Sequence, residues 1–433
     1  MSQAQNPVLT LVDVCKAFPK PSGEPLTVLA DINVALKDGE ILGLVGRSGS
    51  GKSTLLRIAA GLMPPSSGEV LYRGERLEGP HEGIAVVFQT FALFPWLTVL
   101  ENVEAGLDAL GLGREEARSR AQAAIDLIGL DGFQEAYPRE LSGGMRQRVG
   151  FARAFVIKPF LLLMDEPFSA LDVLTAETLR TDLLDLWTGR QLPTKSILIV
   201  THNIEEAVMM CDRILVLSSN PGCIAAELPV ILPHPRNRLD SSFQDIADEL
   251  YAILVSRSLA EISAQKDKHG GIVRPLPRAS VSRISGLIET LAKPPCDGNA
   301  DLPKLAHALN LQLDELLAAA EALHILEFAE LKEDRLKLTA AGRVFAEADT
   351  EERKRVFKEH LLNFVPLAAH IRRILDERAG HSAPRQRFEV ELEDHLTRAE
   401  AERSLRVVID WGRYAELFGY DDRTKKFIGV AQA

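Results

Sequence analysis

One stretch of the chain has the spacing G-x-x-x-x-G-K-[ST], namely Gly46-Arg47-Ser48-Gly49-Ser50-Gly51-Lys52-Ser53-Thr54. Glycines allow a backbone to curl so that successive N–H groups point at phosphate oxygens. We expect Lys52 to neutralise the β- and γ-phosphates of a nucleotide, and the Ser53 hydroxyl to reach Mg²⁺. An apolar run precedes the stretch and a helical pattern follows it, as such a loop requires. The motif alone predicts a phosphate-binding NTPase.

A pair of acids, Asp165 and Glu166, ends an apolar run at residues 160–164. A strand end places carboxylates at the edge of a sheet, where a phosphate loop would also lie. We expect Asp165 to hold Mg²⁺, directly or through water, and Glu166 to act as the general base toward the attacking water. An isolated Asp-Glu pair is more often solvated surface, but the apolar strand before this one favours the catalytic role.

A third candidate is the run Leu141-Ser142-Gly143-Gly144-Met145-Arg146-Gln147. Small residues that open a helix make an anion site, and this chain already has one such site. A second is explained if it closes over the nucleotide of a neighbouring subunit. For an isolated Ser-Gly-Gly run, a simple helix cap is the commoner interpretation.

The elements that must position these residues form an α/β pattern. Short, continuously apolar runs occur at residues 41–45, 84–88, 160–164 and 196–200, each followed by polar or turn residues. Strands without alternation are covered on both faces, which is typical of a largely parallel sheet. Prolines and a glycine between residues 218 and 238 predict an extended connector. We therefore assign residues 1–240 to the first domain.

Residues 241–279 are predicted to be a helix, at 241–265, and a polar linker, at 266–277. Residues 280–433 are predicted to form a mainly helical domain. Helices at 302–309 and 313–323, followed by a hairpin at 325–331 and 335–338 around the turn 332–334, resemble a winged-helix module. The order recurs as a helix at 351–378, helices within 389–411, and strands at 414–420 and 426–429 around the turn 421–425. This recurrence suggests a second winged-helix-like unit.

The ordered motifs resemble those of the ABC transporter ATPase family, over residues 7 to about 240. Gly46–Thr54 matches the Walker A motif, Gln89 the Q-loop, residues 160–166 Walker B, and His202 the switch histidine. Residues 141–147 match the LSGGQ signature, with Met145 where Gln is commonest, and residues 169–172 match the D-loop that ends at Asp172. Phe18 stands where the family stacks an aromatic on adenine. Six motifs in the family's order leave little room for chance.

The resemblance implies a fold and a mechanism. The fold would be a P-loop ABC cassette, with a mixed sheet core and a helical subdomain, followed by the winged-helix-like domain. Two cassettes, either two copies of this one or this one with a different cassette, would bind ATP and Mg²⁺ between them. Each would give its phosphate loop to one site and Ser142–Met145 to the other. Glu166, His202 and Gln89 would be catalytic, and Ser53, Gln89 and Asp165 would serve the metal.

Two segments resemble the nitrate/sulfonate/taurine import branch: Phe94-Pro95-Trp96-Leu97-Thr98-Val99-Leu100-Glu101-Asn102-Val103, and Asn220-Pro221-Gly222 leading to Leu232-Pro233-His234-Pro235-Arg236. The C-terminal region also resembles an AAA-associated accessory domain of that branch. The likeness implies ATP-driven import of a small anion such as nitrate, sulfonate, taurine or bicarbonate. The partners would be membrane permease subunits, contacted by Phe94 and Trp96, and indirectly a substrate-binding protein. For Trp96, burial in the core is an equally open interpretation.

Composition restricts the alternatives. No apolar run is long enough to span a bilayer and the N-terminus has no secretory pattern, so we expect a protein attached to the cytoplasmic face of the inner membrane through its partners. The four cysteines are far apart in the sequence and predict reduced thiols. The formal net charge of −11 argues against a dedicated nucleic-acid binder.

A soluble ABC ATPase with a nucleic-acid-linked role, acting through the C-terminal domain, is the alternative function. Two features disfavour it: the chain has a single motif set, and no coiled-coil insert follows Gln89. Residues 280–433 contain 23 Lys and Arg against 27 Asp and Glu, and the predicted helix 313–323 contains three acids and no basic residue. A groove-reading helix needs donors and cations. We therefore expect no nucleic acid, and we predict a regulatory or dimer-bracing role for the C-terminal domain.

Overall fold

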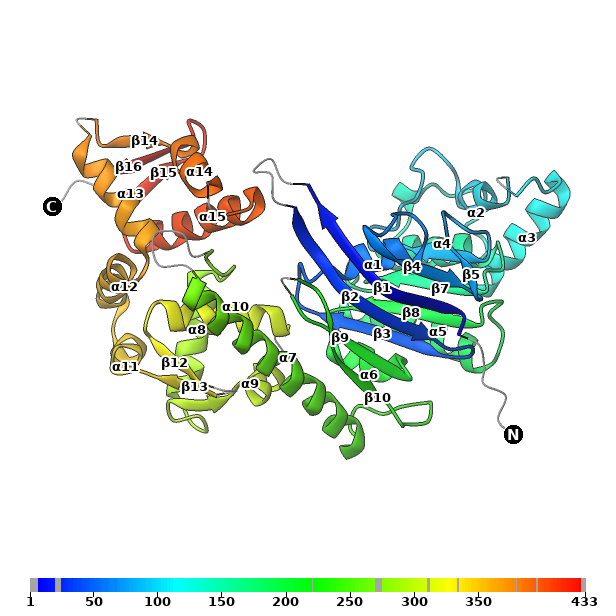
Figure 1. The fold of residues 1–433 in the computed structure, drawn as a ribbon, viewed down its shortest axis with the longest axis horizontal. Coiled ribbons are helices and arrows are strands. Elements are labelled where there is room, and N and C mark those ends of the chain that lie inside the picture. The colour runs from blue at the N-terminus through cyan, green and yellow to red at the C-terminus, as the bar shows by residue number, and fades with distance from the viewer. Residues whose placement is uncertain are drawn as a thin grey trace. The chain divides into compact units, whose positions relative to one another are not determined.

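The computed structural model describes residues 7–19, 25–108, 110–219, 221–268, 275–309, 312–332, 335–378, 380–394 and 396–429. Asn220, the middle of the predicted linker at 266–277, and two residues of the turn at 332–334 lie outside these ranges. The chain divides into two units, Met1–Leu250 and Tyr251–Ala433, which are described separately (Figure 1). The division falls inside helix α7 (Ser241–Lys268), beyond the predicted end of the first domain at residue 240.

A six-stranded sheet in the order β10-β9-β3-β8-β7-β6 forms the centre of the first unit. The other five strands, from β9 to β6 in this order, pair in parallel, and β10 is antiparallel to β9. The strands are β3 (Ile41–Gly46), β6 (Ile84–Val87), β7 (Leu161–Asp165), β8 (Ser196–Thr201), β9 (Arg213–Leu217) and β10 (Ile224–Pro229). The predicted parallel strands at 41–45, 84–88, 160–164 and 196–200 are confirmed within one residue at either end.

A second sheet, in the order β2-β1-β4-β5, makes the unit a mixed α/β fold. Its strands are β1 (Leu9–Phe18), β2 (Leu26–Leu36), β4 (Ser67–Tyr72) and β5 (Glu75–Arg76), all antiparallel. The apolar runs did not single out these strands, because buried and exposed residues are mixed along them and neither β1 nor β2 forms a continuous apolar run.

The predicted connector at 218–238 is partly wrong, because β10 occupies its middle. Pro229 is the last residue of that strand. Proline lacks an N–H and is tolerated at the end of an edge strand, where no ladder bond is lost. The prolines therefore limit this strand rather than prevent it.

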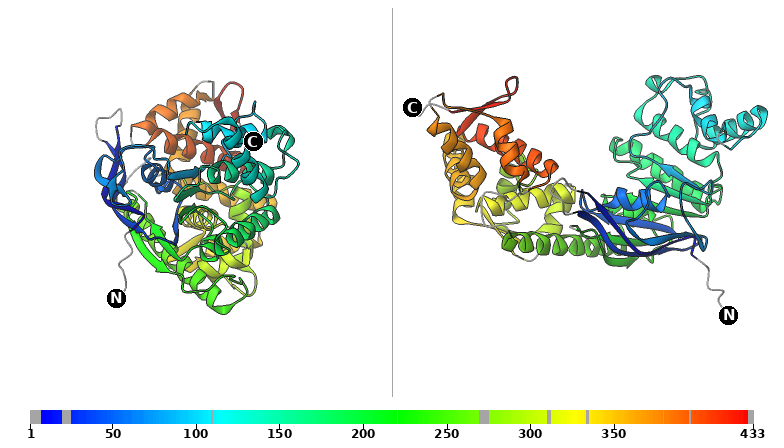
Figure 2. Two further views of the ribbon diagram at one scale, coloured as in Figure 1. Left: turned by 90° about the vertical axis from the view of Figure 1, so that its right-hand side faces the viewer. Right: turned by 45° about the horizontal axis from the view of Figure 1, so that its top comes forward.

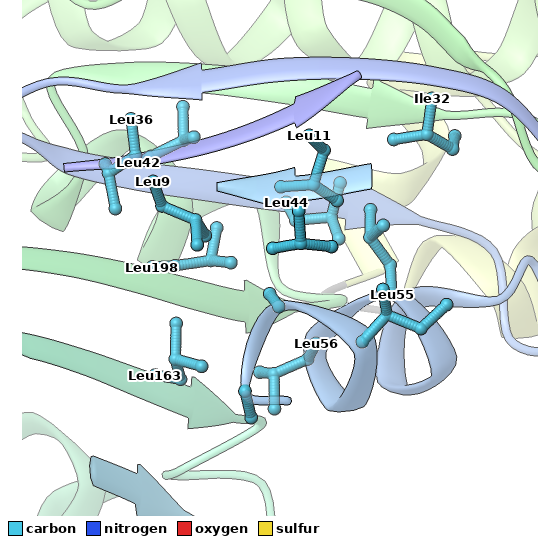
Figure 3. Close-up of a cluster of buried hydrophobic side chains, with 14 of the residues drawn as sticks. Leu9, Leu11, Ile32, Leu36, Leu42, Leu44, Leu55, Leu56, Leu163 and Leu198 are labelled. Carbon is cyan, nitrogen blue, oxygen red and sulfur yellow. The ribbon is translucent and has the colours of Figure 1, made fainter. Parts of the chain in front are cut away.

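Helix α1 (Lys52–Ala59) packs between the two sheets and completes one apolar cluster (Figure 3). Leu9 and Leu11 of β1 contribute to it with Leu42 and Leu44 of β3, all almost fully buried. Each such side chain contributes about 1.5–3 kcal/mol to folding. The cluster fixes the start of α1, and hence the loop before it, against both sheets.

Three helices form a helical subdomain: α2 (Val99–Asp108), α3 (Arg114–Leu127) and α4 (Gly143–Phe155). In Figure 2, α2 and α3 are the cyan helices that stand away from the blue strands. Helices α5 (Val173–Thr188) and α6 (Ile204–Met210) follow β7 and β8. Among the described residues, no helix is both long and apolar enough to cross a bilayer.

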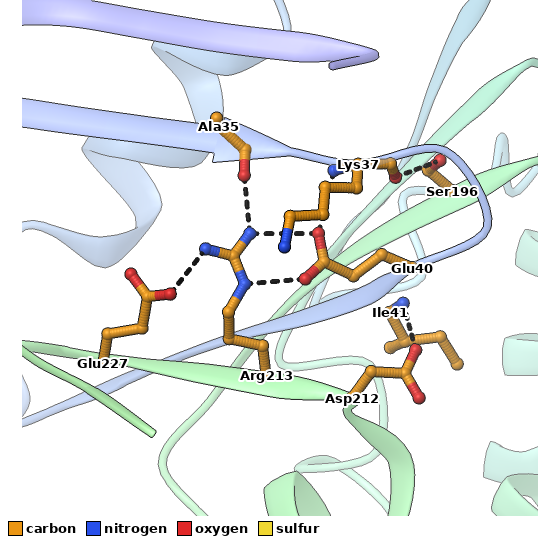
Figure 4. A network of polar contacts seen from close by, with 8 residues as sticks. All are labelled: Ala35, Lys37, Glu40, Ile41, Ser196, Asp212, Arg213 and Glu227. Carbon is orange, nitrogen blue, oxygen red and sulfur yellow. Dashed lines mark hydrogen bonds and ion pairs between the residues drawn. The ribbon is translucent and has the colours of Figure 1, made fainter. Parts of the chain in front are cut away.

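At the far end of the central sheet, Arg213 holds three strands together (Figure 4). Its Nε donates to Glu40 at 2.7 Å, its Nη1 to Glu227 at 2.9 Å, and its Nη2 to the carbonyl of Ala35 at 2.6 Å. Arg213 begins β9, whereas the phosphate loop follows the carboxyl end of β3, a parallel neighbour. The network therefore lies at the opposite end of the sheet from that loop.

The second unit contains the same order of elements twice. The first copy is α8 (Val281–Ala292), β11 (Asn299–Asp301), α9 (Leu302–Leu309), α10 (Leu313–Ile325), β12 (Ala329–Lys332) and β13 (Arg335–Leu338). The second is α13 (Pro366–Glu377), β14 (Ser382–Pro384), α14 (Arg385–Glu393), α15 (Arg398–Tyr414), β15 (Phe418–Asp421) and β16 (Lys426–Gly429). Both sheets place the last strand in the middle, as β11-β13-β12 and β14-β16-β15. This is a winged-helix arrangement in each copy.

The single helix predicted at 351–378 is wrong. The structure has two helices there, α12 (Thr350–Phe364) and α13, with Val365 extended between them. Pro366 disfavours a helical conformation in the residue before it and itself suits the first position of a helix. Together with α11 (Ala340–Glu347), α12 joins the two winged units.

An aromatic cluster connects the two copies. The ring of Phe357 in α12 lies 6.0 Å from Phe328, 6.2 Å from Trp411 and 5.3 Å from Tyr414. The indole N–H of Trp411 donates to the carbonyl of Ala279 at 2.9 Å, so this buried polar atom is paired. The second unit thus has its own core.

Candidate nucleotide-hydrolysis site

Four neighbouring strands deliver the predicted site residues to one edge of the central sheet. The phosphate loop follows β3, His202 follows β8, Glu166 follows β7 and Gln89 follows β6. The sheet order β3-β8-β7-β6 makes these strands consecutive neighbours, and all pair in parallel. The carboxyl ends of parallel strands meet at one edge. The site is therefore a direct consequence of the strand order.

The phosphate loop has the backbone that its glycines allow. Gly49 and Gly51 have φ of +84° and +99°, in the left-handed region. A Cβ on Gly51 would approach Leu29 to 2.7 Å, so only glycine fits there. The ammonium of Lys52 donates to the carbonyls of Gly46 at 2.6 Å and Arg47 at 3.0 Å, and therefore lies across the loop.

The chemistry of the loop fits a nucleotide phosphate. Ser50 has a buried hydroxyl that finds no partner in the described part of the chain, and α1 begins immediately after the loop. A helix N-terminus with a lysine beside it favours an anion. The hydroxyl of Ser53 donates to Asp165 at 3.1 Å, so the two predicted metal ligands meet. Burial raises the pKa of Asp165, and the Ser53 hydrogen bond opposes that shift.

Glu166 lies at the centre of a polar cluster. Its Oε2 is 3.1 Å from Nδ1 of His202 and accepts a hydrogen bond from Gln89 Nε2, also at 3.1 Å. Gln89 Nε2 is also 3.2 Å from the hydroxyl of Ser169. The structure thus brings the three predicted catalytic residues together. The Gln89 amide lies against Glu166, whereas Ser53 bonds Asp165.

The same contacts set the charge of the pair. The hydrogen bond from His202 lowers the pKa of Glu166 below its ordinary value, although burial opposes the shift. That bond also raises the pKa of His202, again against burial. Glu206 and Lys52 are the other charged groups that influence His202, and they act in opposite directions. Glu166 is therefore ionised at neutral pH.

The signature residues and the D-loop pack on each other. The Ser142 hydroxyl caps α4 by accepting from the N–H of Met145 at 3.3 Å. A Cβ on Gly144 would meet Thr175 at 2.4 Å, and one on Gly143 would lie 3.5 Å from Leu171. The first turn of α4 therefore requires a small residue against Thr175 in the first turn of α5.

Asp172 of the D-loop caps the next helix. Its carboxylate accepts from the Thr175 N–H at 3.0 Å and from the Thr175 hydroxyl at 2.7 Å. These bonds lower the pKa of Asp172, which stays ionised at the positive end of α5. Asp172 thus joins the D-loop to the first turn of α5.

Phe18 is half-buried at the end of β1, where it pairs with Leu26 of β2. The ammonium of Lys16 lies 5.3 Å from its ring centroid. Two and three residues further along β2, Val28 and Leu29 border Gly51 of the phosphate loop. Phe18 therefore stands on the strand pair that adjoins the loop.

The predicted permease-contact residues are exposed aromatics. Phe94 and Trp96 are 39% and 69% exposed, with ring centroids 5.6 Å apart. The core interpretation of Trp96 is therefore wrong. Asn102, fully buried, accepts from the Phe94 N–H at 2.9 Å and donates to the Phe94 carbonyl at 3.1 Å. The loop is held in shape while its rings face outward.

Sequence motifs did not identify Arg153 and Arg180. Arg153 of α4 donates to the carbonyls of Ala92 at 2.6 Å and Phe91 at 3.2 Å, and so ties the signature helix to the loop after Gln89. Arg180 of α5 lies 3.7 Å from Glu206 of α6. The signal for both was weak, because one arginine on an amphipathic helix usually marks a solvated face.

Comparison with known proteins defines the class. The ABC transporter family model matches residues 29–169, and the C-terminal AAA-associated domain model matches residues 303–421. The nitrate import ATP-binding protein of Synechocystis is 44% identical over 265 residues, 59% of this chain and 98% of that protein. The aliphatic sulfonates import ATP-binding protein of Bacillus cereus is 39% identical over 256 residues, 58% of this chain and 99% of that protein.

A solved dimeric ATP-binding cassette with ADP and phosphate is 33% identical and covers 52% of this chain and 100% of that one, with a TM-score of 0.47. The fold and the site define a P-loop ATP hydrolase. The extent of the match to the nitrate import protein shows that the chain belongs to the ABC transporter ATP-binding family, with an AAA-associated C-terminal domain.

The His202–Glu166 contact predicts a pH-dependent contribution to stability. His202, with a raised pKa, contributes fully below its unfolded value of 6.5 and loses the contribution as pH rises through its folded pKa. Glu166, with a lowered pKa, contributes above 4.5 and loses the contribution as pH falls through its folded pKa. We expect His202→Gln to lower the melting temperature most between these values and least at alkaline pH.

Thermal melts of the native chain and His202→Gln across this pH range test the expectation. The control is Glu166→Gln, in which a further His202→Gln change should have no pH-dependent effect. A melting difference that is the same at every pH would contradict the contact.

Proposed function

We propose that this chain is the motor subunit of an ABC importer for a small anion such as nitrate, sulfonate, taurine or bicarbonate. The observation that supports this proposal most is that Gln89, Glu166 and His202 lie together beside the Ser53–Asp165 contact. The named substrates of the nitrate and sulfonate import relatives support the choice of anion. The chain would lie peripherally on the cytoplasmic face of the inner membrane.

In this proposal, ATP lies on the phosphate loop with adenine on Phe18. Lys52 and the loop N–H groups from Gly46 to Thr54 hold the phosphates. Ser53 and Asp165 would hold Mg²⁺, with Gln89 as the third predicted ligand, and the ion would neutralise charge that develops on the β- and γ-phosphates. The hydroxyl and carboxylate oxygens of Ser53 and Asp165 are the ligand types that this ion prefers.

Glu166 acts as the general base. Its lowered pKa keeps the carboxylate ionised, but it also makes the carboxylate a weaker base. When His202 moves from Oε2 to the γ-phosphate, Glu166 loses one of its two donors and becomes more basic. The switch histidine would thus both contact the phosphate and release the base, so that full base strength coincides with a bound nucleotide.

The signature residues Ser142, Gly143, Gly144 and Met145 would complete the site of a second cassette. Within this chain they cap α4 and pack on Leu171 and Thr175 of the D-loop segment. Asp172, which caps α5, would lie close to the second cassette. This supports a dimer of cassettes, with two composite sites.

The permease would dock on the loop of Phe94 and Trp96. Exposed aromatics held by a buried asparagine clasp have the rigidity and apolar area of an interface anchor. Through Arg153 the same loop touches the signature helix. A substrate-binding protein would act indirectly, by delivering the anion to the permease.

The C-terminal domain would regulate or brace the motor. In its first winged unit, α10 is too buried to read a nucleic acid, because every residue from Leu316 to Leu323 is buried. In the second unit, exposed arginines of α15 pair with acids, including Arg406 with Glu402 and Arg413 with Asp422. Among the described residues of these two helices there is no row of unpaired cations, and this supports a role without nucleic acid.

The base assignment predicts that Glu166→Gln traps ATP. Glutamine preserves the shape of the side chain and removes proton acceptance, so turnover should fall at least ~10²-fold, the usual scale for a general base. ATP binding and ATP-dependent dimerisation should persist. The measurements are steady-state hydrolysis and size-exclusion chromatography with ATP, and exposed Glu82→Gln is the control. Near-native hydrolysis by Glu166→Gln would sink the assignment.

The composite-site model predicts complementation. A Lys52→Ala chain mixed with a Ser142→Arg chain leaves one site with both lesions and one site intact. Hydrolysis should therefore exceed that of either variant alone. A mixture of Lys52→Ala with Ser53→Ala has a damaged phosphate loop in every site and should show no recovery. Equal activities of the two mixtures would remove the support for sharing in trans.

The docking proposal predicts that Trp96→Ala weakens assembly with the cognate permease, because a buried aromatic anchor commonly contributes about 2 kcal/mol or more to an interface. Co-purification of the complex and ATP affinity are the measurements, and the affinity should be unchanged. Phe133→Ala removes another exposed aromatic, outside this loop, as the control. Undiminished assembly in the Trp96 variant would exclude this loop as the anchor.

A further inference from the structure

Helix α6 determines where the switch histidine stands. It begins at Ile204, directly after His202 and Asn203. The Asn203 side chain caps it by accepting from the Glu206 N–H at 3.0 Å, and the Asn203 N–H donates to the Thr201 hydroxyl at 3.0 Å. A helix of seven residues has about two turns and is not stable alone. Its position must come from the groups around it.

One arginine holds the last turn of α6 firmly. Arg236, whose side chain is almost fully buried, donates through Nη1 to the carbonyls of Val208 at 2.6 Å and Cys211 at 2.7 Å. The last carbonyls of a helix have no partner within it, so these bonds satisfy groups that would otherwise be orphaned. Arg236 also donates to its own segment, at the Leu232 carbonyl, at 3.0 Å.

Two arginines hold the first turn loosely. Nε of Arg180 is 3.7 Å from Glu206, and Nε of Arg238 is 3.6 Å from Glu205. Among the described residues, neither Nε has a hydrogen-bond partner although both are buried. The separations exceed the hydrogen-bonding range of about 2.7–3.2 Å. Arg238 is held independently, because its Nη1 lies 2.6 Å from Glu177 of α5.

We propose that α6 pivots on Arg236 and that Arg238 and Arg180 are positioning residues for ATP hydrolysis. Their guanidinium groups limit the travel of the first turn, and so set where His202 stands relative to Glu166. A buried donor without a partner is unfavourable, so each arginine Nε gains a hydrogen bond if it approaches its carboxylate when the turn shifts. This inference rests on the role proposed above for His202.

The arrangement explains a sequence feature that the nucleotide chemistry leaves unused. Arg236 ends the run Leu232-Pro233-His234-Pro235-Arg236, and Arg238 follows shortly after it. This segment leads directly into α7 at Ser241. The part of the chain that joins the cassette to the C-terminal unit therefore carries two of the three arginines that hold the switch helix.

The first test separates positioning from nucleotide binding in the full chain. Arg238→Gln should lower kcat about tenfold to hundredfold, as a small misplacement of a reacting group does. The Kd for ATP should be unchanged, because Arg238 contacts α5 and α6 and not the phosphate loop. Arg238→Lys keeps the charge and should recover part of kcat. A fall in ATP affinity equal to the fall in kcat would overturn the proposal.

The matched control is Arg213→Gln, at the opposite end of the sheet (Figure 4). It also removes an arginine that bridges two glutamates. It should lower the melting temperature and leave kcat near the native value. A similar loss of kcat in both variants would show that Arg238 acts only through general stability.

The second test asks whether Arg238 acts through His202. In a His202→Gln background, Arg238→Gln should cause no further loss of turnover, whereas independent action would multiply the losses and overturn the proposal. The pH-dependent melting difference caused by His202→Gln should also disappear in Arg238→Gln, and its persistence would equally overturn it. Native turnover by His202→Gln would instead refute the role of His202, and the melting difference would still decide the positioning.

Discussion

Two donors from distant segments share one carboxylate oxygen of Glu166, and the rest of the cassette is arranged so that they can. Gln89 Nε2 and His202 Nδ1 each lie 3.1 Å from Oε2. Glu166 itself has φ of +46°, and its N–H donates to the Val200 carbonyl of the adjacent strand at 2.9 Å. Such a conformation is uncommon for a residue with a side chain and persists only where its surroundings fix it. Here the β7–β8 pairing fixes it.

The sequence predicted which residues belong to this cluster, and the fold brings them together. A polar residue after an apolar run is visible in the letters at Gln89, Glu166 and His202. The order of the strands is not visible, because it depends on which long-range pairings bury the most surface. The resemblance to a known family provided that information in advance. Without it, the motifs would have placed Asp165 and Glu166 beside the phosphate loop and left Gln89 and His202 unassigned.

Other features left no readable pattern. The antiparallel sheet alternates weakly and has bulges in the β1–β2 register, so its period of two is broken. Arg180 and Arg236 act on groups more than twenty residues away along the chain, and Asn102 acts on the backbone of the loop just before it. A single polar residue carries no spacing to interpret. Pro366 was readable, because the residue before a proline is biased away from helix, and the prediction of one helix at 351–378 overlooked it.

The contact between His202 and Glu166 has opposite effects on the resting site and on the reaction. It keeps Glu166 charged in a half-buried place, which stabilises the fold, and in the proposed mechanism it also weakens the general base. In the proposed mechanism a motor gains from this conflict, because a site whose base is weak until its histidine leaves hydrolyses little ATP before the histidine moves. The signal that moves the histidine must act on α6. That helix meets α5, which the D-loop opens, through Arg180, and it meets the segment leading to the C-terminal unit through Arg236 and Arg238. In the mechanism we propose, control of the base therefore depends on how far these arginines let the two turns of α6 move.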